Sequence, residues 1–170
     1  MPTSREVAEH VMSCYEALYR VMGERAGTLT TDAFVIRVYE SARSIGALGL
    51  EMRTQLVDVQ PRPFPVLEAV LEHSIDGDPS GAMLLYALSM VVGPRLLVTL
   101  LDARAAIGDD EELRGLLDHG SQVIVTVIRL IGDTVQDRDA IDDPAWQAAA
   151  RDLTLTLDGA GYGDSLGICR

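Results

Sequence analysis

The sequence predicts an all-α protein, and three observations support that prediction. Apolar residues recur at spacings of three and four along most of the chain, which is the period of a helix that buries one face. Hydrophobic residues make up 48% of the chain and aromatic residues only 5%, so the core must consist mainly of aliphatic side chains. Helix-start patterns precede several segments. We expect one domain over residues 1–158, a bundle of five to six helices of which two are long.

The first helix is expected to begin at Thr3, because Thr3 and Glu6 form a capping-box pattern that satisfies the amides of a first turn. It should end at Gly23 or Gly27, since glycine often terminates helices. Its apolar stripe consists of Val7, Val11, Cys14, Leu18 and Val21.

The second helix is expected to run from Thr31 or Asp32 to about Asp58. Gly46 and Gly49 fall in its middle, where each glycine costs about 0.5–1 kcal/mol relative to alanine. Two interpretations remain open: another backbone approaches closely at these glycines, or packing elsewhere offsets their cost.

The sequence "QPRPFP" breaks the helical pattern, because its prolines remove amide donors and favour extended neighbours. A short helix from Pro65 to Ser74 follows. The next helix should begin with Asp78 as N-cap and Pro79 at its first position, and end near Gly108. We expect it to be kinked at Gly93-Pro94.

This apolar segment approaches the length of a bilayer span at residues 82–101, yet it contains a Gly-Pro break and an arginine near its middle. An arginine at the centre of an isolated span costs at least about 2.5 kcal/mol. We therefore expect a buried core helix and no membrane association.

The segment "VIVTVIRLI" is rich in β-branched residues and would form a strand by propensity alone. Gln122, Thr126, Arg129 and Asp133 recur at four, three and four, which favours a helix, although a strand over Val123–Ile131 remains the alternative. A last helix should begin at Asp143-Pro144, and the Gly-rich residues 159–170 should form a flexible tail.

The formal charge of −12 argues against nucleic acid and anionic membranes as partners, because both would repel the chain. The chain has no Lys and no Asn, a composition that suggests a GC-rich bacterial genome. Cys14 and Cys169 lie too far apart in sequence for a metal-binding motif, and the N-terminus has no apolar export segment. We expect a cytoplasmic protein with reduced thiols.

Each of the three histidines follows a carboxylate, in Glu9-His10, Glu72-His73 and Asp118-His119. Adjacent helical residues point about 100° apart, so these pairs do not form metal sites by themselves. The residues that would form a zinc site are Glu6, His10 and Cys14, which share a helix face, joined by His73 and His119 from other helices. We favour no metal site, and whether the histidines converge is left open.

Arg95 and Tyr86 are the candidate ligand-binding residues. Arg95 follows a proline among aliphatic residues, where a buried guanidinium would require an anionic partner. The alternative is that Arg95, Thr99 and Asp102 lie on a narrow solvent-exposed stripe. Tyr86 fits core packing as readily as a ligand pocket.

These patterns favour a non-catalytic helical protein that binds a partner protein or a small, largely apolar ligand between its helices. The alternative is a metal-dependent or acid/base enzyme with its site in the bundle core, and no catalytic residue can be named for it. We predict no cofactor, and a divalent metal belongs only to that alternative. We expect a homodimer, because apolar stripes on long helices are easily buried against a second copy.

Overall fold

The computed structural model describes residues 2–76, 81–136 and 144–167, which form helices and no strand. Helices α4, η1 and α5 follow one another without interruption, so the described residues form six helical bodies, and the predicted all-α class is confirmed. The elements are α1 (Ser4–Ala26), α2 (Asp32–Gln55), α3 (Pro65–Asp76), α4 (Ala82–Ala87), the π-helical turn η1 (Leu88–Val92), α5 (Gly93–Ala106), α6 (Glu111–Gln136) and α7 (Pro144–Gly159).

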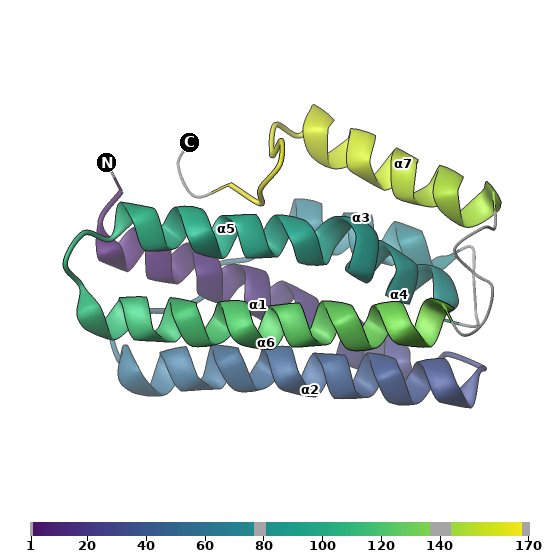
Figure 1. Ribbon diagram of the computed structural model, residues 1–170, viewed down its shortest axis with the longest axis horizontal. Coiled ribbons are helices and arrows are strands. Elements are labelled where there is room, and N and C mark those ends of the chain that lie inside the picture. Colours follow the sequence, from purple (N-terminus) through teal and green to yellow (C-terminus); the bar gives the residue numbers. More distant parts are fainter. Residues whose placement is uncertain (1, 77–80, 137–143, 168–170) are drawn as a thin grey trace.

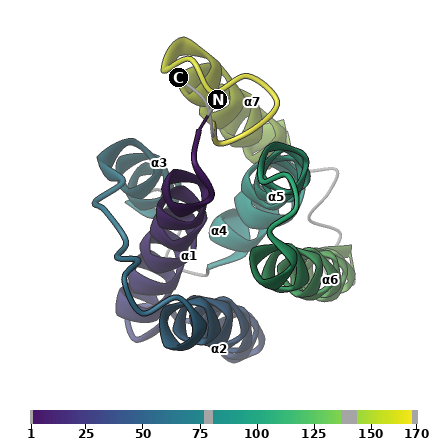
Figure 2. The ribbon, with the colours of Figure 1, turned by 90° about the vertical axis from the view of Figure 1, so that its left-hand side faces the viewer.

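Four helical bodies of similar length form the bundle, where the sequence suggested two long ones. They are α1 with 23 residues, α2 with 24, the continuous helix Ala82–Ala106 with 25 and α6 with 26. Helix α1 packs along α2, α5 along α6, and α2 along α6. Helix α7 lies across the opposite side of the bundle from α2 (Figures 1 and 2).

Helix α1 begins as its sequence predicts. The Thr3 hydroxyl accepts a hydrogen bond from the Glu6 amide at 3.2 Å, and the Thr3 amide donates to the Glu6 carboxylate at 2.8 Å, which completes the capping box. The whole predicted apolar stripe of this helix, from Val7 to Val21, is buried. Helical period and cap chemistry therefore agree here.

The segment Val123–Ile131 is helical despite its β-branched residues. It lies within α6, where Ile124, Val127 and Ile131 are buried while Thr126 and Arg129 are exposed. The spacing of the polar residues correctly predicted a helix here, because only a helix places these buried residues against the bundle and these polar residues in water.

The expected irregularity at Gly93-Pro94 takes the form of a π-helical turn just before the proline. The Gly93 amide donates to the Leu88 carbonyl, five residues back, and Pro94 has no amide hydrogen to continue the α-helical pattern. A Cβ at Gly93 would lie 2.7 Å from Cγ1 of Ile128, so only glycine permits α6 to pack this closely.

One helix in the described part of the chain, Ala82–Ala106, is long and apolar enough to cross a membrane by length and composition. In the bundle, 67% of its most apolar window is buried by the other helices. It therefore packs as a core helix of this bundle.

Tyr15 of α1 reaches into the core and meets Gly120 of α6. A Cβ at Gly120 would overlap the Tyr15 hydroxyl, so the close approach of these two helices requires glycine. The hydroxyl is buried and has no hydrogen-bond partner among the described residues. Burial raises the pKa of Tyr15, so the phenol stays neutral.

Candidate functional site

Arg95 lies beneath the end of α7, on the side of the bundle that α7 covers. Its side chain is buried, and Nη2 donates to Oδ1 of Asp158 at 2.8 Å, while Nη1 donates to the carbonyl of Gly163. Thr99 one turn later is fully buried, so these two residues do not lie on a solvent-exposed stripe. The anion that a buried guanidinium requires is supplied by the chain itself.

Tyr86 packs against the start of α7, the opposite end of that helix from Asp158. It is buried on α4, and its ring centroid is 6.0 Å from that of Trp146 at the start of α7, in a tilted arrangement. The two candidate ligand-binding residues thus hold the two ends of α7 against the helix Ala82–Ala106.

The segment after α7 is also held in place through residue 167. Leu166 is fully buried, and its amide donates to the Thr99 hydroxyl at 2.7 Å. Its carbonyl lies 3.1 Å from Nε2 of His10 on α1. The ring of Phe64 contacts both His10 and Tyr162, with centroid separations of 5.6 and 5.5 Å. Where the sequence suggested a free tail from residue 159, the described part of that segment packs on α1 and α5.

The candidate metal ligands lie in different environments. Burial lowers the pKa of His10 and raises the pKa of the Cys14 thiol to about 12, so both groups remain neutral beside one another, with Nε2 and Sγ 3.8 Å apart. Glu6 is engaged in the capping box, and Nδ1 of His119 contacts Oε2 of Glu51 at 2.8 Å on the α2–α6 surface.

His73 lies in α3, and its side chain is outside the described part of the structure. Over the described ranges, no three His, Cys, Asp or Glu side chains come close enough to hold a metal ion. His10 and His119 each have a different partner, so these two imidazoles do not share a site.

An open groove of about 870 Å³ runs between α1 and α2, away from both clusters of predicted site residues. Its small residues include Ala42, Gly46 and Gly49, and the ring of Tyr19 lies directly over Gly46, where a Cβ would be 2.6 Å from Cδ2. The close approach at the α2 glycines is therefore made by an α1 side chain. The groove is lined by Tyr15, Glu16, Tyr19, Arg20, Gly23, Glu24, Tyr39, Ala42, Arg43, Gly46, Ala47, Gly49, Leu50 and Arg53.

The groove exposes large apolar side chains to solvent. Tyr19 is 48% exposed, Tyr39 63% and Leu50 66%, although side chains of this size are ordinarily covered when several lie together. They come from two helices and border one groove.

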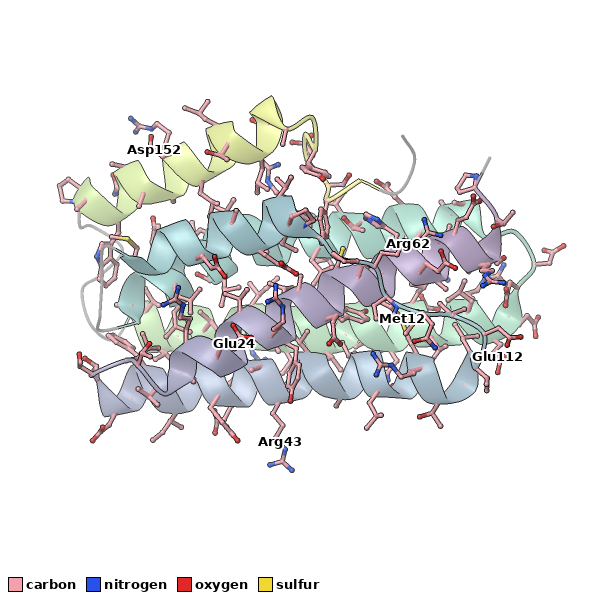
Figure 3. The ribbon with its side chains drawn as sticks, turned by 180° about the vertical axis from the view of Figure 1, so that it is seen from behind. Met12, Glu24, Arg43, Arg62, Glu112 and Asp152 are labelled. Carbon is pink, nitrogen blue, oxygen red and sulfur yellow. The ribbon has the colours of Figure 1, made fainter. Side chains whose placement is uncertain are left out.

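The charge of the groove differs in sign from that of the chain. Three arginines and two glutamates line it, while the chain carries −12. Arg53 pairs with Glu16 at 3.6 Å, and Arg20 pairs with Glu68. Arg43 has no ion pair or hydrogen bond among the described residues, and it extends from α2 away from the bundle (Figure 3). The groove thus offers one uncommitted cation beside apolar side chains.

A second hollow lies inside the bundle next to Gly93 and Ile128, with a volume of about 20 Å³. Its lining is almost entirely apolar, and it has room for about one water molecule. It is a packing defect beside the π-helical turn and too small for a ligand.

Sequence reasoning missed the groove because its signal lies in exposed apolar residues, whereas buried polar residues such as Arg95 indicated a site elsewhere. A signal was present: Ile36, Tyr39 and Leu50 are apolar but lie off the buried stripe of α2, on one face with Arg43 between them. A second apolar stripe on one helix indicates a second surface to be covered.

Comparison with known proteins adds no relative: no protein-family model, no curated protein and no solved structure matches this chain. The class that fold and geometry define is a six-helix all-α bundle with an open, arginine-bordered groove between α1 and α2.

Proposed function

We propose that this protein is a non-catalytic helical binding protein that holds a partner in the α1–α2 groove. The observation that carries the proposal is the combination, in one groove, of three exposed large apolar side chains with an unpaired arginine. Such a surface binds a complementary surface that is apolar and carries an acidic group.

The shape of the groove favours a protein helix over a small molecule. Its α2 wall extends from Tyr39 to Arg53, roughly 20 Å at the rise of an α-helix, and the groove is open along its length. Pockets for small ligands enclose most of the ligand surface, whereas a helix docks along a groove with side chains spaced three and four apart.

The charged residues of the groove also suit a binding role. They are arginines and glutamates, and neither His10 nor His119 lines the groove. Arginine suits this role because its planar guanidinium recognises carboxylates and packs on aromatic rings. A cytoplasmic location belongs to the same proposal, and the free, buried thiol of Cys14 agrees with it.

The proposal is tested with 1-anilinonaphthalene-8-sulfonate, a fluorescent probe with an apolar ring system and one anionic group. We expect the wild-type protein, diluted to nanomolar concentration, to bind this dye with a measurable fluorescence increase. Leu50→Glu places a charge in the groove and should weaken dye binding at least about fivefold, because an ionised group opposes apolar contact.

Leu155→Glu is the matched control, since Leu155 is 61% exposed on α7 and lies outside the groove. Both substitutions introduce a good helix former on an exposed face, so both variants should fold. Equal dye binding by the two variants would contradict the assignment of the groove as the binding surface.

A further inference from the structure

The exposed apolar side chains are unevenly distributed over the molecule. Among the described residues, four of the nine large exposed hydrophobic side chains, Tyr19, Ile36, Tyr39 and Leu50, belong to α1 and α2. Met90 and Leu101 are eleven positions apart on the continuous helix Ala82–Ala106, Val125 and Leu155 are the only ones on α6 and α7, and Val57 follows α2. A single exposed leucine is ordinary, whereas a group on one face indicates a covered surface.

We propose that a second copy of this chain covers this face, with the two α2 helices packed antiparallel about a two-fold axis that passes beside Gly46-Ala47. This inference rests on the proposed binding role of the α1–α2 groove and names its occupant. The argument comes from the pattern of residues on α2 to either side of that axis.

The exposed residues of α2 are self-complementary about Gly46-Ala47. Residues equally far from this point, one before it and one after it, come to the same height in an isologous contact between antiparallel helices. Such a pair meets only where both residues lie near the centre of the exposed face, because each edge of α2 faces the same edge of its partner.

The same symmetry pairs the apolar positions. Arg43 lies three residues before Gly46, and Leu50 lies three residues after Ala47. The aliphatic part of the Arg43 side chain can then pack on Leu50 of the partner subunit while its guanidinium stays at the edge. The unpaired arginine and the exposed leucine thus meet complementary surfaces without any other protein.

Small residues at the axis permit the helices to approach. Ala47 is exposed and Gly46 carries no side chain, so the crossing point presents little bulk apart from the Tyr19 ring that lies over Gly46. Aromatic rings near the centre of an interface are common contributors to binding.

The face is large enough for a stable dimer. Helix α2 has 24 residues and is therefore about 36 Å long. Together with α1 it presents a surface about two helix diameters wide, on the order of 700 Å² in plan. Stable interfaces bury about 800 Å² per partner, which this face approaches.

Sedimentation equilibrium on the full chain tests the proposal. The wild-type protein should be a dimer at micromolar concentration, and Leu50→Glu should raise the dimer dissociation constant at least about tenfold, while Leu155→Glu leaves it unchanged. Arg43→Glu should also weaken the dimer, because a carboxylate cannot pack on Leu50 of the partner subunit as the aliphatic part of arginine does. Circular dichroism establishes that each variant is folded.

A wild-type monomer at all concentrations up to about 100 μM, or a dimer that neither Leu50→Glu nor Arg43→Glu weakens, would overturn the proposal. The dye experiment separates this failure from failure of the proposed function. A monomer whose dye binding still depends on Leu50 retains a binding groove with another occupant, whereas a monomer without such binding contradicts both.

Discussion

The two opposite sides of the bundle differ in whether other parts of the chain cover their side chains. On one side, α7 and the segment after it cover the helix Ala82–Ala106, and the buried Arg95 finds Asp158 there. On the other side, α2 leaves Tyr39, Arg43 and Leu50 in solvent. Asp152 on α7 and Arg43 on α2 lie at these opposite edges (Figure 3).

This difference teaches where to look for binding in a helical protein. A buried arginine attracts attention because it requires an anion, yet the chain itself satisfies that requirement at Arg95. The α1–α2 face, in contrast, has large apolar side chains that no other part of the described chain covers. The comparison predicts that substitutions on the α7 side change stability, while substitutions on the α1–α2 face change association.

The largest expected difference concerns two leucines. Leu157 on α7 is fully buried, so Leu157→Ala should lower the free energy of unfolding by about 2–5 kcal/mol, through lost burial and the cavity left behind. Leu50 is 66% exposed, so Leu50→Ala should change the stability of the monomer by less than about 0.5 kcal/mol. Urea unfolding at a protein concentration low enough to dissociate any dimer measures both changes. Equal losses of unfolding free energy in the two variants would contradict the proposed difference between the two sides.

A second prediction concerns Tyr15, which lines the groove and also reaches the core. Gly120→Ala should destabilise the protein by about 1–3 kcal/mol, because the new methyl group overlaps the Tyr15 hydroxyl. Tyr15→Phe removes a buried hydroxyl without a partner among the described residues and should be neutral or stabilising. The double variant should recover part of the loss, and strictly additive effects in thermal unfolding would show that the two residues do not meet.

A third prediction compares two arginines. Arg95→Ala should cost about 1–2 kcal/mol, a value reduced from that of a fully buried pair because Asp158 is 47% exposed. Arg53→Ala, which removes a half-exposed arginine on the α1–α2 face, should cost less than about 0.5 kcal/mol. Hydrogen exchange should in addition show faster exchange of α7 amides in Arg95→Ala only. A variant whose α7 amides exchange as in wild type would mean that Arg95 does not hold α7.

The smallest expected effect is a pH dependence from His10. Burial lowers the pKa of His10 in the folded protein from its ordinary value of 6.5, so below that pH the unfolded chain binds a proton that the folded protein does not. Stability from this group is therefore complete above about pH 6.5 and is lost as the pH falls toward the lower, folded value. Unfolding measured between pH 7 and about pH 5 should show this loss, and His10→Gln should reduce it. An unchanged slope would assign the effect to other groups.

The helices were largely predictable because their signals are local. The Thr3–Glu6 capping box, the Pro144 start of α7 and the helical character of Val123–Ile131 follow from spacing and from the chemistry of helix ends. The N-cap expected at Asp78, the position Pro79 after it and the cap at Asp143 lie outside the described residues.

The site was not predictable in the same way, because it depends on which helices become neighbours. Sequence spacing indicated that Arg95 needs an anion but could not name Asp158, which lies 63 residues away. It also could not show that Leu166 would pack between Thr99 and His10, so the Gly-rich segment resembled a free tail. The exposed stripe on α2 was visible in the sequence, but its exposure was known only once α1 and α6 had taken the other faces of that helix.

Cysteine cross-linking tests the central claim, that a second copy covers the α1–α2 face, most directly. In a Cys169→Ser background, Ala47→Cys places one exposed thiol beside the proposed two-fold axis, and Ala148→Cys places one on the exposed surface of α7. A disulfide requires Cα atoms within about 7 Å, so mild oxidation should convert Ala47→Cys rapidly into a covalent dimer and leave Ala148→Cys monomeric. Equal cross-linking at both positions, or none at position 47, would contradict the account.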